Sequence, residues 1–247
     1  MKNYTDVAFW QKYWAGKKRA VRVGPRYPFH DLFDAVLAKR KTGSMLEVGG
    51  FPGYFAVYFA KYRGLKSTLL DYYVDQKMLK EVWAANNLYD GEVRVRKEDL
   101  FAAKFGKKYD VVYSLGFLEH FDDTEQVLAK HWSAVGKGGE LLVVLPNFQG
   151  INGHLQLAWD PENLAKHNLL SMDIGYLKRA ARAAGIPRAR IFYWGGLRVW
   201  LENLSSRSLW QKFVVGSLYA LGLGVKAIGV NNKFLSPYIV VYAKRSR

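Results

Sequence analysis

The sequence of 247 residues contains no cysteine. This absence excludes disulfide bonds, catalysis by a thiolate and zinc sites built on thiolate ligands. The start of the chain lacks the apolar stretch of a signal peptide, because Lys2 is followed by mixed aromatic and charged residues. We therefore expect a cytoplasmic protein. The uncharged run Phe213–Val225 is too short to cross a bilayer, which takes about 20 residues.

Acidic residues are few compared with basic ones: 21 Asp and Glu against 37 Lys and Arg, a net charge of +16. Residues 1–43 hold ten basic residues against three acids, residues 44–177 hold fourteen against seventeen, and residues 178–247 hold thirteen against Glu202 alone. Basic flanks favour an anionic partner, which could be a phosphorylated or carboxylated substrate, a membrane surface or nucleic acid. The alternative is a basic surface that serves only solubility.

A glycine-rich turn follows the first apolar run. The stretch Ser44–Tyr54 reads Ser-Met-Leu-Glu-Val-Gly-Gly-Phe-Pro-Gly-Tyr and leads into the helix-like segment Phe55–Tyr62. This order predicts a strand, a nucleotide-binding turn and a helix, in which glycine lets the backbone approach a ligand. Glu47 precedes the turn, and Phe51 stands where a dinucleotide turn has its second glycine. A positively charged nucleoside therefore suits the turn better than a pyrophosphate.

Four further apolar runs end in polar residues. Ser67–Leu70 ends at Asp71, about 20 residues beyond the first turn, where a second strand presents a carboxylate to ribose hydroxyls. The later runs are Val93–Val95 before Asp99, Tyr109–Ser114 before Gly116, and Glu140–Leu145 before Asn147. Strands alternating with helices predict a parallel sheet with helices on both faces.

Together, these strand ends over roughly Ser44–Asn147 resemble the class I S-adenosylmethionine-dependent methyltransferase superfamily. The resemblance implies S-adenosylmethionine as cofactor. It also implies that the methionine part is surrounded by Glu47, Gly49, Gly50 and Gly53, the ribose is held by Asp71, the adenine is framed by Asp99 and Leu100, and the floor is made by Ser114, Leu115 and Gly116. Tyr72 either stacks on the adenine or only packs. The alternative for the acids is that they cap helices or face solvent.

The fold class that follows is a single α/β domain of residues 1–247, a Rossmann-like, doubly wound, mostly parallel sheet of seven strands with an antiparallel last strand. Residues 1–43 are expected to form a helical lid, residues 44–147 the cofactor-binding core, and residues 148–247 the substrate side. The family joins its last two strands by a short hairpin, but here a helical insertion over residues 197–235 intervenes. It could form a dimer face, a substrate cover or an interfacial membrane helix, and a buried cover is favoured.

The acceptor side offers two candidate bases, His120 and His154, since a base is needed only if the acceptor arrives protonated. His120 could instead only pack the turn after the fourth strand. Candidate substrate-binding residues are Tyr13 and Trp14 from the lid, with Glu119, Asn147 and Asn152. No group of His, Asp and Glu has the spacing of metal ligands, so no metal is expected.

The predicted function is methyl transfer to an oxygen or nitrogen of a small-molecule, glycan-like or lipid-like acceptor, with an anionic acceptor favoured by the basic flanks. Ser114-Leu-Gly-Phe117 lacks the Asn/Asp-Pro-Pro-aromatic motif of enzymes that methylate exocyclic amines of bases. Carbon-5 methylation of pyrimidines needs the missing cysteine. An RNA methyltransferase acting on ring nitrogens or ribose is the first alternative, and a non-catalytic, cofactor-binding scaffold is the second.

Overall fold

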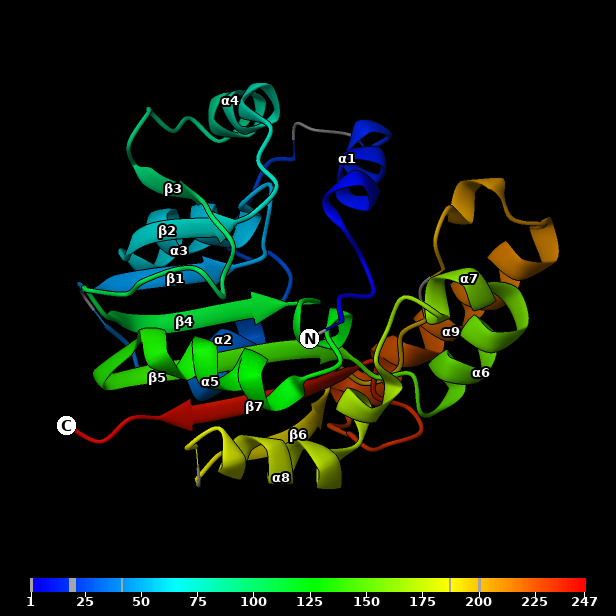
Figure 1. Cartoon of the computed structure of the whole chain (residues 1–247). Coiled ribbons are helices and arrows are strands. Elements are labelled where there is room, and N and C mark those ends of the chain that lie inside the picture. Colours follow the sequence, from blue (N-terminus) through cyan, green and yellow to red (C-terminus); the bar gives the residue numbers. More distant parts are fainter. Residues whose placement is uncertain (1, 18–20, 41, 187, 200) are drawn as a thin grey trace.

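The computed structural model of the protein describes residues 2–17, 21–40, 42–186, 188–199 and 201–247 (Figure 1). Its centre is a seven-stranded sheet in the order β3-β2-β1-β4-β5-β7-β6. The strands are β1 Ser44–Val48, β2 Lys66–Asp71, β3 Val93–Lys97, β4 Tyr109–Leu115, β5 Val135–Pro146, β6 Arg190–Trp194 and β7 Tyr238–Lys244. Only β7 runs antiparallel to its neighbours, β5 and β6. The predicted fold class is confirmed.

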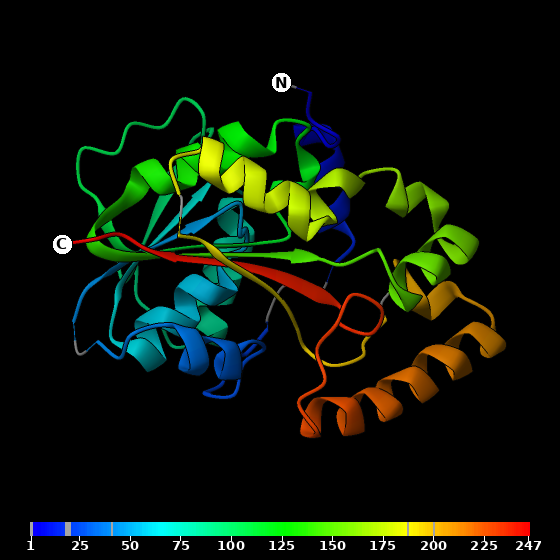
Figure 2. The ribbon, with the colours of Figure 1, turned by 90° about the horizontal axis from the view of Figure 1, so that it is seen from below.

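Helices cover both faces of this sheet, as Figures 1 and 2 show. Alternate strand residues face opposite sides, so Met45 belongs to one core and Leu46 to the other. The first core includes residues of α2 His30–Val36, α3 Tyr54–Arg63 and α4 Gln76–Ala85. The second includes residues of α5 Thr124–Ala134 and α8 Ile174–Ala183. Burial on both faces explains why Leu141–Leu145 is an uninterrupted apolar run.

The N-terminal segment divides into two parts with different positions. α1 Val7–Ala15 contains no buried residue and stands beside the carboxyl ends of the strands (Figure 1). α2 instead packs against the sheet, where Leu32 and Phe33 are fully buried. Residues 1–43 are therefore not lid material throughout, because the apolar face of α2 finds its partner in the core.

The segment between β6 and β7 contains η3 Leu204–Ser206 and α9 Leu209–Ala227. α9 packs through Val215 beside α6 Ile151–Trp159, and only Val215 and Gly222 are buried in it. Figure 2 shows α9 standing apart from the sheet. The buried cover expected for this insertion is therefore wrong: α9 exposes most of its apolar surface. Among the described residues, no helix has both the length and the apolar character to cross a membrane.

The remaining short helices lie in the segments that follow β4 and β5. They are η1 Leu118–His120, α7 Pro161–Leu164 and η2 Leu169–Met172. η1 follows β4 directly, and a hydrogen bond of 2.7 Å from the Asn168 amide to the Glu119 carbonyl ties the segment before η2 to it. This link brings residues 119–120 next to residues 163–168.

Candidate functional site

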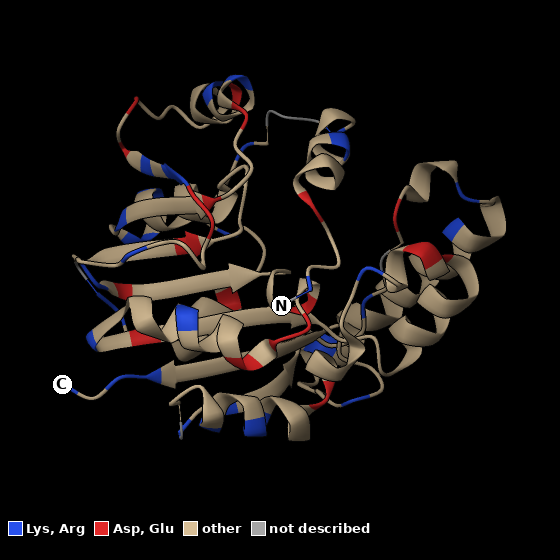
Figure 3. Ribbon diagram, viewed as in Figure 1, with Lys and Arg blue, Asp and Glu red and all other residues tan. Residues whose placement is uncertain are grey.

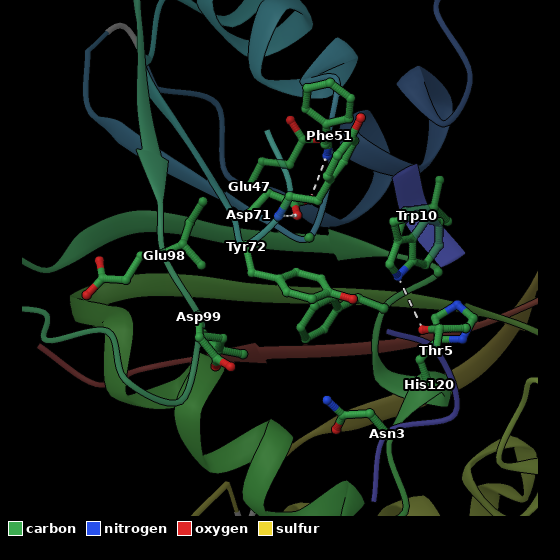
Figure 4. A pocket seen from close by; sticks show the side chains of 18 of the residues that line it. Asn3, Thr5, Trp10, Glu47, Phe51, Asp71, Tyr72, Glu98, Asp99 and His120 are labelled. Atoms are coloured by element: carbon green, nitrogen blue, oxygen red, sulfur yellow. Dashed lines mark hydrogen bonds between the residues drawn. The ribbon is translucent and has the colours of Figure 1, made fainter. Parts of the chain in front are cut away.

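A cavity of about 320 Å³ opens at the carboxyl ends of β1, β2, β3 and β4 (Figure 4). This is the edge at which open α/β sheets bind ligands, and the volume lies in the usual range for a small-molecule site. In Figure 3, acidic residues colour the ribbon red near the ends of β1, β2 and β3. Those that line the cavity are Glu47, Asp71, Glu98 and Asp99.

The glycine turn between β1 and α3 forms one wall. Gly49 has a φ of 63°, in the left-handed region, and a Cβ at this position would lie 2.0 Å from the ring of Phe117. A Cβ on Gly50 would lie 2.0 Å from Oε1 of Glu47. Gly53, at a φ of 88°, precedes α3. Only glycine therefore permits this path of the backbone past β1 and β4.

Glu47 points from the end of β1 toward the first turn of α3. Its Oε2 accepts a hydrogen bond of 2.6 Å from the Ala56 amide, so it caps the helix and lines the cavity at once. Burial raises the pKa of the Glu47 carboxyl to about 8. The helix-capping alternative therefore holds for Glu47, and the same side chain lines the cavity.

Asp71 ties the end of β2 to the glycine turn. Its two carboxylate oxygens accept hydrogen bonds from the amides of Phe51, at 3.0 Å, and Tyr73, at 2.9 Å. Burial raises the pKa of Asp71 to about 6, although these two amides favour the charged form. Asp71 also raises the pKa of Glu47, so the two acids lie within electrostatic reach of each other in one cavity.

The far end of the cavity is formed after β3 and beside β4. Asp99 and Leu100 line it, and Asp99 accepts a hydrogen bond of 2.7 Å from the Phe101 amide. Tyr72 crosses the cavity in Figure 4, and Leu115 and Gly116 complete the wall. The structure thus places nine of the eleven predicted cofactor-binding residues on the cavity wall, all except Ser114 and Gly53, the residue before α3.

Aromatic side chains of α1 form another wall of the cavity. Trp10, Tyr13 and Trp14 line it. The Trp14 ring meets the Phe51 ring edge-on at 5.6 Å, and the Trp10 ring meets the His120 ring at 5.5 Å. Trp10 was missed as a site residue although it belongs to the same helical stripe as Tyr13 and Trp14. Asn3 and Thr5 were also missed, because no periodic pattern marks residues before the helix.

His120 also lines the cavity, and its side chain is 9% exposed. Its Nδ1 lies 3.0 Å from the carbonyl oxygen of Lys166. Burial lowers the pKa of His120 to about 3, which makes the neutral ring a weak base at physiological pH. A direct role of His120 as general base is therefore disfavoured by its surroundings.

Besides Gly53, five predicted residues do not line the cavity. Ser114 faces the other side of β4, where its hydroxyl lies 3.1 Å from Nε2 of the buried His131. Asn147 donates to the carbonyls of Lys233 and Ser236 and so holds the chain before β7. The other three also lie outside the cavity lining. Glu119 is fully enclosed, Asn152 is buried, and His154 is exposed on α6. Their sequence positions after strands were correct, but their side chains point elsewhere.

A family model described as a methyltransferase domain matches residues 21–186. Among solved structures, an S-adenosylmethionine-dependent methyltransferase from Archaeoglobus fulgidus is 17% identical with a TM-score of 0.56, covering 87% of this chain and 91% of that one. A methyltransferase from Mesorhizobium loti is 15% identical with a TM-score of 0.57, covering 88% and 97%.

Phosphoethanolamine N-methyltransferase 2 from Haemonchus contortus is 16% identical with a TM-score of 0.62, covering 100% of this chain and 61% of that longer one. No curated protein matches the chain. The family model covers well over half of the sequence, and the solved structures share its fold. The chain therefore belongs to the methyltransferase-domain family, on the class I S-adenosylmethionine-dependent methyltransferase fold that its strand ends predicted.

Proposed function

We propose that this protein transfers the methyl group of S-adenosylmethionine to an oxygen or nitrogen of an anionic, lipid-like acceptor. The observation that carries the proposal is the meeting, in one cavity, of the glycine turn with the acids at the ends of β1, β2 and β3. In the fold relatives from Haemonchus contortus, the solved structures hold S-adenosylmethionine or S-adenosylhomocysteine. The family match supports the same chemistry.

Each part of the cofactor has candidate partners in the cavity. Glu47 and the turn at Gly49, Gly50 and Gly53 would hold the methionine part, because a buried acid and close backbone suit a cationic ligand. Asp71 would accept hydrogen bonds from the ribose hydroxyls. The adenine would lie against Tyr72, Asp99, Leu100, Leu115 and Gly116.

Methyl transfer from a sulfonium is a displacement in line with the leaving sulfur, so the protein mainly aligns the reactants and excludes water. Trp10, Tyr13 and Trp14 would help to align the reactants and to exclude water, because they form one wall of the cavity. His120 would position the acceptor as a neutral ring. Asn147, Asn152 and His154 are left without a role at this cavity.

The lipid-like character of the acceptor is supported by α9. Its exposed face presents large apolar side chains that nothing in the described structure covers: Leu209, Trp210, Phe213, Leu221, Leu223 and Ile228 are 57% to 83% exposed. The exposed apolar side chains carry no charge, and α9 also contains Lys212 and Lys226, of which Lys226 pairs with Asp31 at 2.6 Å. An apolar face bordered by cations is the arrangement that binds an anionic membrane surface. A cytoplasmic site of action belongs to the same proposal.

Transfer of labelled methyl groups to acceptors from a cell extract tests the reaction. The protein is incubated with methyl-labelled S-adenosylmethionine, and the lipid, RNA and water-soluble fractions are counted separately. We expect label in the lipid fraction, and none with the Gly49→Ala variant. Label in RNA would instead support the RNA methyltransferase alternative. Cofactor binding without transfer to any fraction would support the non-catalytic alternative.

Removing two aromatic rings from α9 should release the protein from membranes. For Trp210→Ser combined with Phe213→Ser, we expect at least a 10-fold loss of binding to vesicles containing phosphatidylglycerol, because these side chains are 65% and 66% exposed and free to insert. Co-sedimentation at low and high salt measures the effect, and added salt should weaken the wild-type binding.

Tyr89→Ser is the matched control, because Tyr89 is 81% exposed but lies between α4 and β3, away from α9. It should bind vesicles like the wild type. Equal vesicle binding by all three proteins would reject the membrane surface. Loss of a dimer in the α9 variant, with no vesicle binding by the wild type, would assign the face to a second copy of the chain.

A further inference from the structure

Three potential metal-binding side chains meet beside the cavity, which only His120 of the three lines. Glu119 and His120 lie on η1, and His167 arrives from the segment before η2. One candidate ligand atom from each lies within 4.8 Å of the others. The two imidazole centroids are 5.0 Å apart, and the hydrogen bond from the Asn168 amide to the Glu119 carbonyl holds the two segments together.

Backbone carbonyls orient both histidines in the same way. Nδ1 of His120 lies 3.0 Å from the Lys166 oxygen, and Nδ1 of His167 lies 2.8 Å from the Asn163 oxygen. A carbonyl can only accept, so each Nδ1 must carry the ring proton. Each Nε2 therefore keeps its lone pair. Histidines that bind metals are held in this way, with the second nitrogen donating to a carbonyl or carboxylate.

Glu119 is an independent sign that a cation belongs here. Its side chain is 1% exposed, and within the described chain its Oε2 has no hydrogen-bond partner. No ion pair between described residues involves it. Neither Nε2 can donate a hydrogen bond to it, because the ring protons are on Nδ1. A buried carboxyl without a partner is costly, and a bound cation would offset that cost.

We propose that Glu119, His120 and His167 bind a divalent transition-metal cation, with Zn²⁺ as the first candidate. Two imidazole nitrogens with one carboxylate suit zinc, iron or cobalt, whereas Mg²⁺ and Ca²⁺ take oxygen ligands. Ligands about 2.1 Å from zinc are roughly 3.4 Å from each other, so a separation at the upper limit of 4.8 Å would shorten by roughly 1.4 Å. Rotation of the Glu119 side chain can provide this, since its Oε2 has no hydrogen bond to break.

Three protein ligands leave at least one coordination position open. His120 lines the cofactor cavity, so an acceptor in that cavity can reach the open position. A metal there would lower the pKa of an acceptor hydroxyl. This role rests on the proposed methyl transfer, but the metal site itself does not.

Binding of Co²⁺ to protein stripped with a chelator tests the site, since bound Co²⁺ absorbs visible light. We expect the wild type to bind one equivalent, and Glu119→Gln and His167→Ala to weaken the affinity at least 100-fold. His154→Ala is the matched control: its Nδ1 also lies near a carbonyl, 2.9 Å from Gly150, but it is exposed on α6 and outside the cluster. It should bind Co²⁺ like the wild type.

A second readout is thermal unfolding with and without Zn²⁺, because a ligand that binds the folded state raises the unfolding temperature. Zn²⁺ should stabilise the wild type and His154→Ala but not His167→Ala or Glu119→Gln. Wild-type binding no tighter than that of His167→Ala would overturn the site. S-adenosylmethionine binding is measured on the same samples: cofactor binding without metal binding rejects only the metal site, and the converse rejects only the proposed function.

Discussion

Gly49→Ala should lower the affinity for S-adenosylmethionine at least 100-fold. The added methyl group would lie 2.0 Å from the Phe117 ring, at a φ of 63° that alanine avoids. Phe117 packs against Phe121 and His131 at centroid distances of 4.9 and 5.6 Å, and it also lines the cavity. Either its ring moves into the space of the cofactor or the turn shifts, and with it the backbone that would contact the cofactor. Isothermal titration calorimetry measures the affinity.

Gly216→Ala is the control for a glycine substitution elsewhere. Gly216 lies within α9, and a Cβ there has nothing within 4 Å. Alanine should stabilise the protein by about 0.5–1 kcal/mol, because it favours the helix over glycine, and should leave cofactor affinity unchanged. If Gly49→Ala were folded by circular dichroism and bound the cofactor like Gly216→Ala, the turn would not be the binding site.

Asp71→Asn should weaken cofactor binding by roughly 100-fold, because an amide replaces the carboxylate that would accept the ribose hydroxyls; hydrogen bonds to charged groups are worth about 1.5–3 kcal/mol each. The same change should make the unliganded protein more stable at pH 7.5. Burial raises the pKa of Asp71 to about 6, so its charged form is unfavourable in the folded state. Asparagine removes that charge and can still accept one of the two amide hydrogen bonds.

The pH dependence of this effect has a definite sign. A carboxyl with a raised pKa stabilises the folded protein fully below its ordinary value of 3.8, and this contribution is lost as the pH rises through about 6. The free energy of unfolding of the wild type should therefore fall relative to Asp71→Asn between pH 5 and pH 7.5, by about 1.4 kcal/mol, which corresponds to the one pH unit between 5 and the pKa of about 6. Glu47, whose pKa is about 8, stays mostly protonated over this range in the wild type, and Asp71→Asn removes one of the causes that raise this pKa.

Urea unfolding at the two pH values measures the difference, and calorimetry at the same values measures cofactor affinity. Wild-type affinity should decrease below pH 6 as Asp71 takes up a proton, whereas the weaker affinity of Asp71→Asn should change little. A stability difference that stays constant with pH would show that Asp71 is ionised in the same way in the folded and unfolded chain.

Residues close in sequence to a strand end were predicted well. The acid of β1, the glycine turn and the acid of β2 converge because parallel strands end at the same edge of the sheet, which apolar runs and their spacing already indicate. The side on which a residue lies was harder to predict. Leu115 lines the cavity, whereas its neighbour Ser114 faces His131 on α5. Neighbouring residues of a strand point to opposite faces of the sheet, so an error of one residue assigns a side chain to the wrong face. Apolar runs that are buried on both faces do not show which face a given residue belongs to.

The amino-acid sequence alone determined the parallel sheet, the antiparallel closing strand and the nucleotide-binding turn, because each depends on local patterns of apolar, glycine and acidic residues. Tertiary structure alone decided that α9 is exposed and that His154 does not line the cavity. It also placed His167 beside Glu119 and His120. These outcomes depend on packing between segments distant in the chain, and no local pattern encodes which distant side chains will meet.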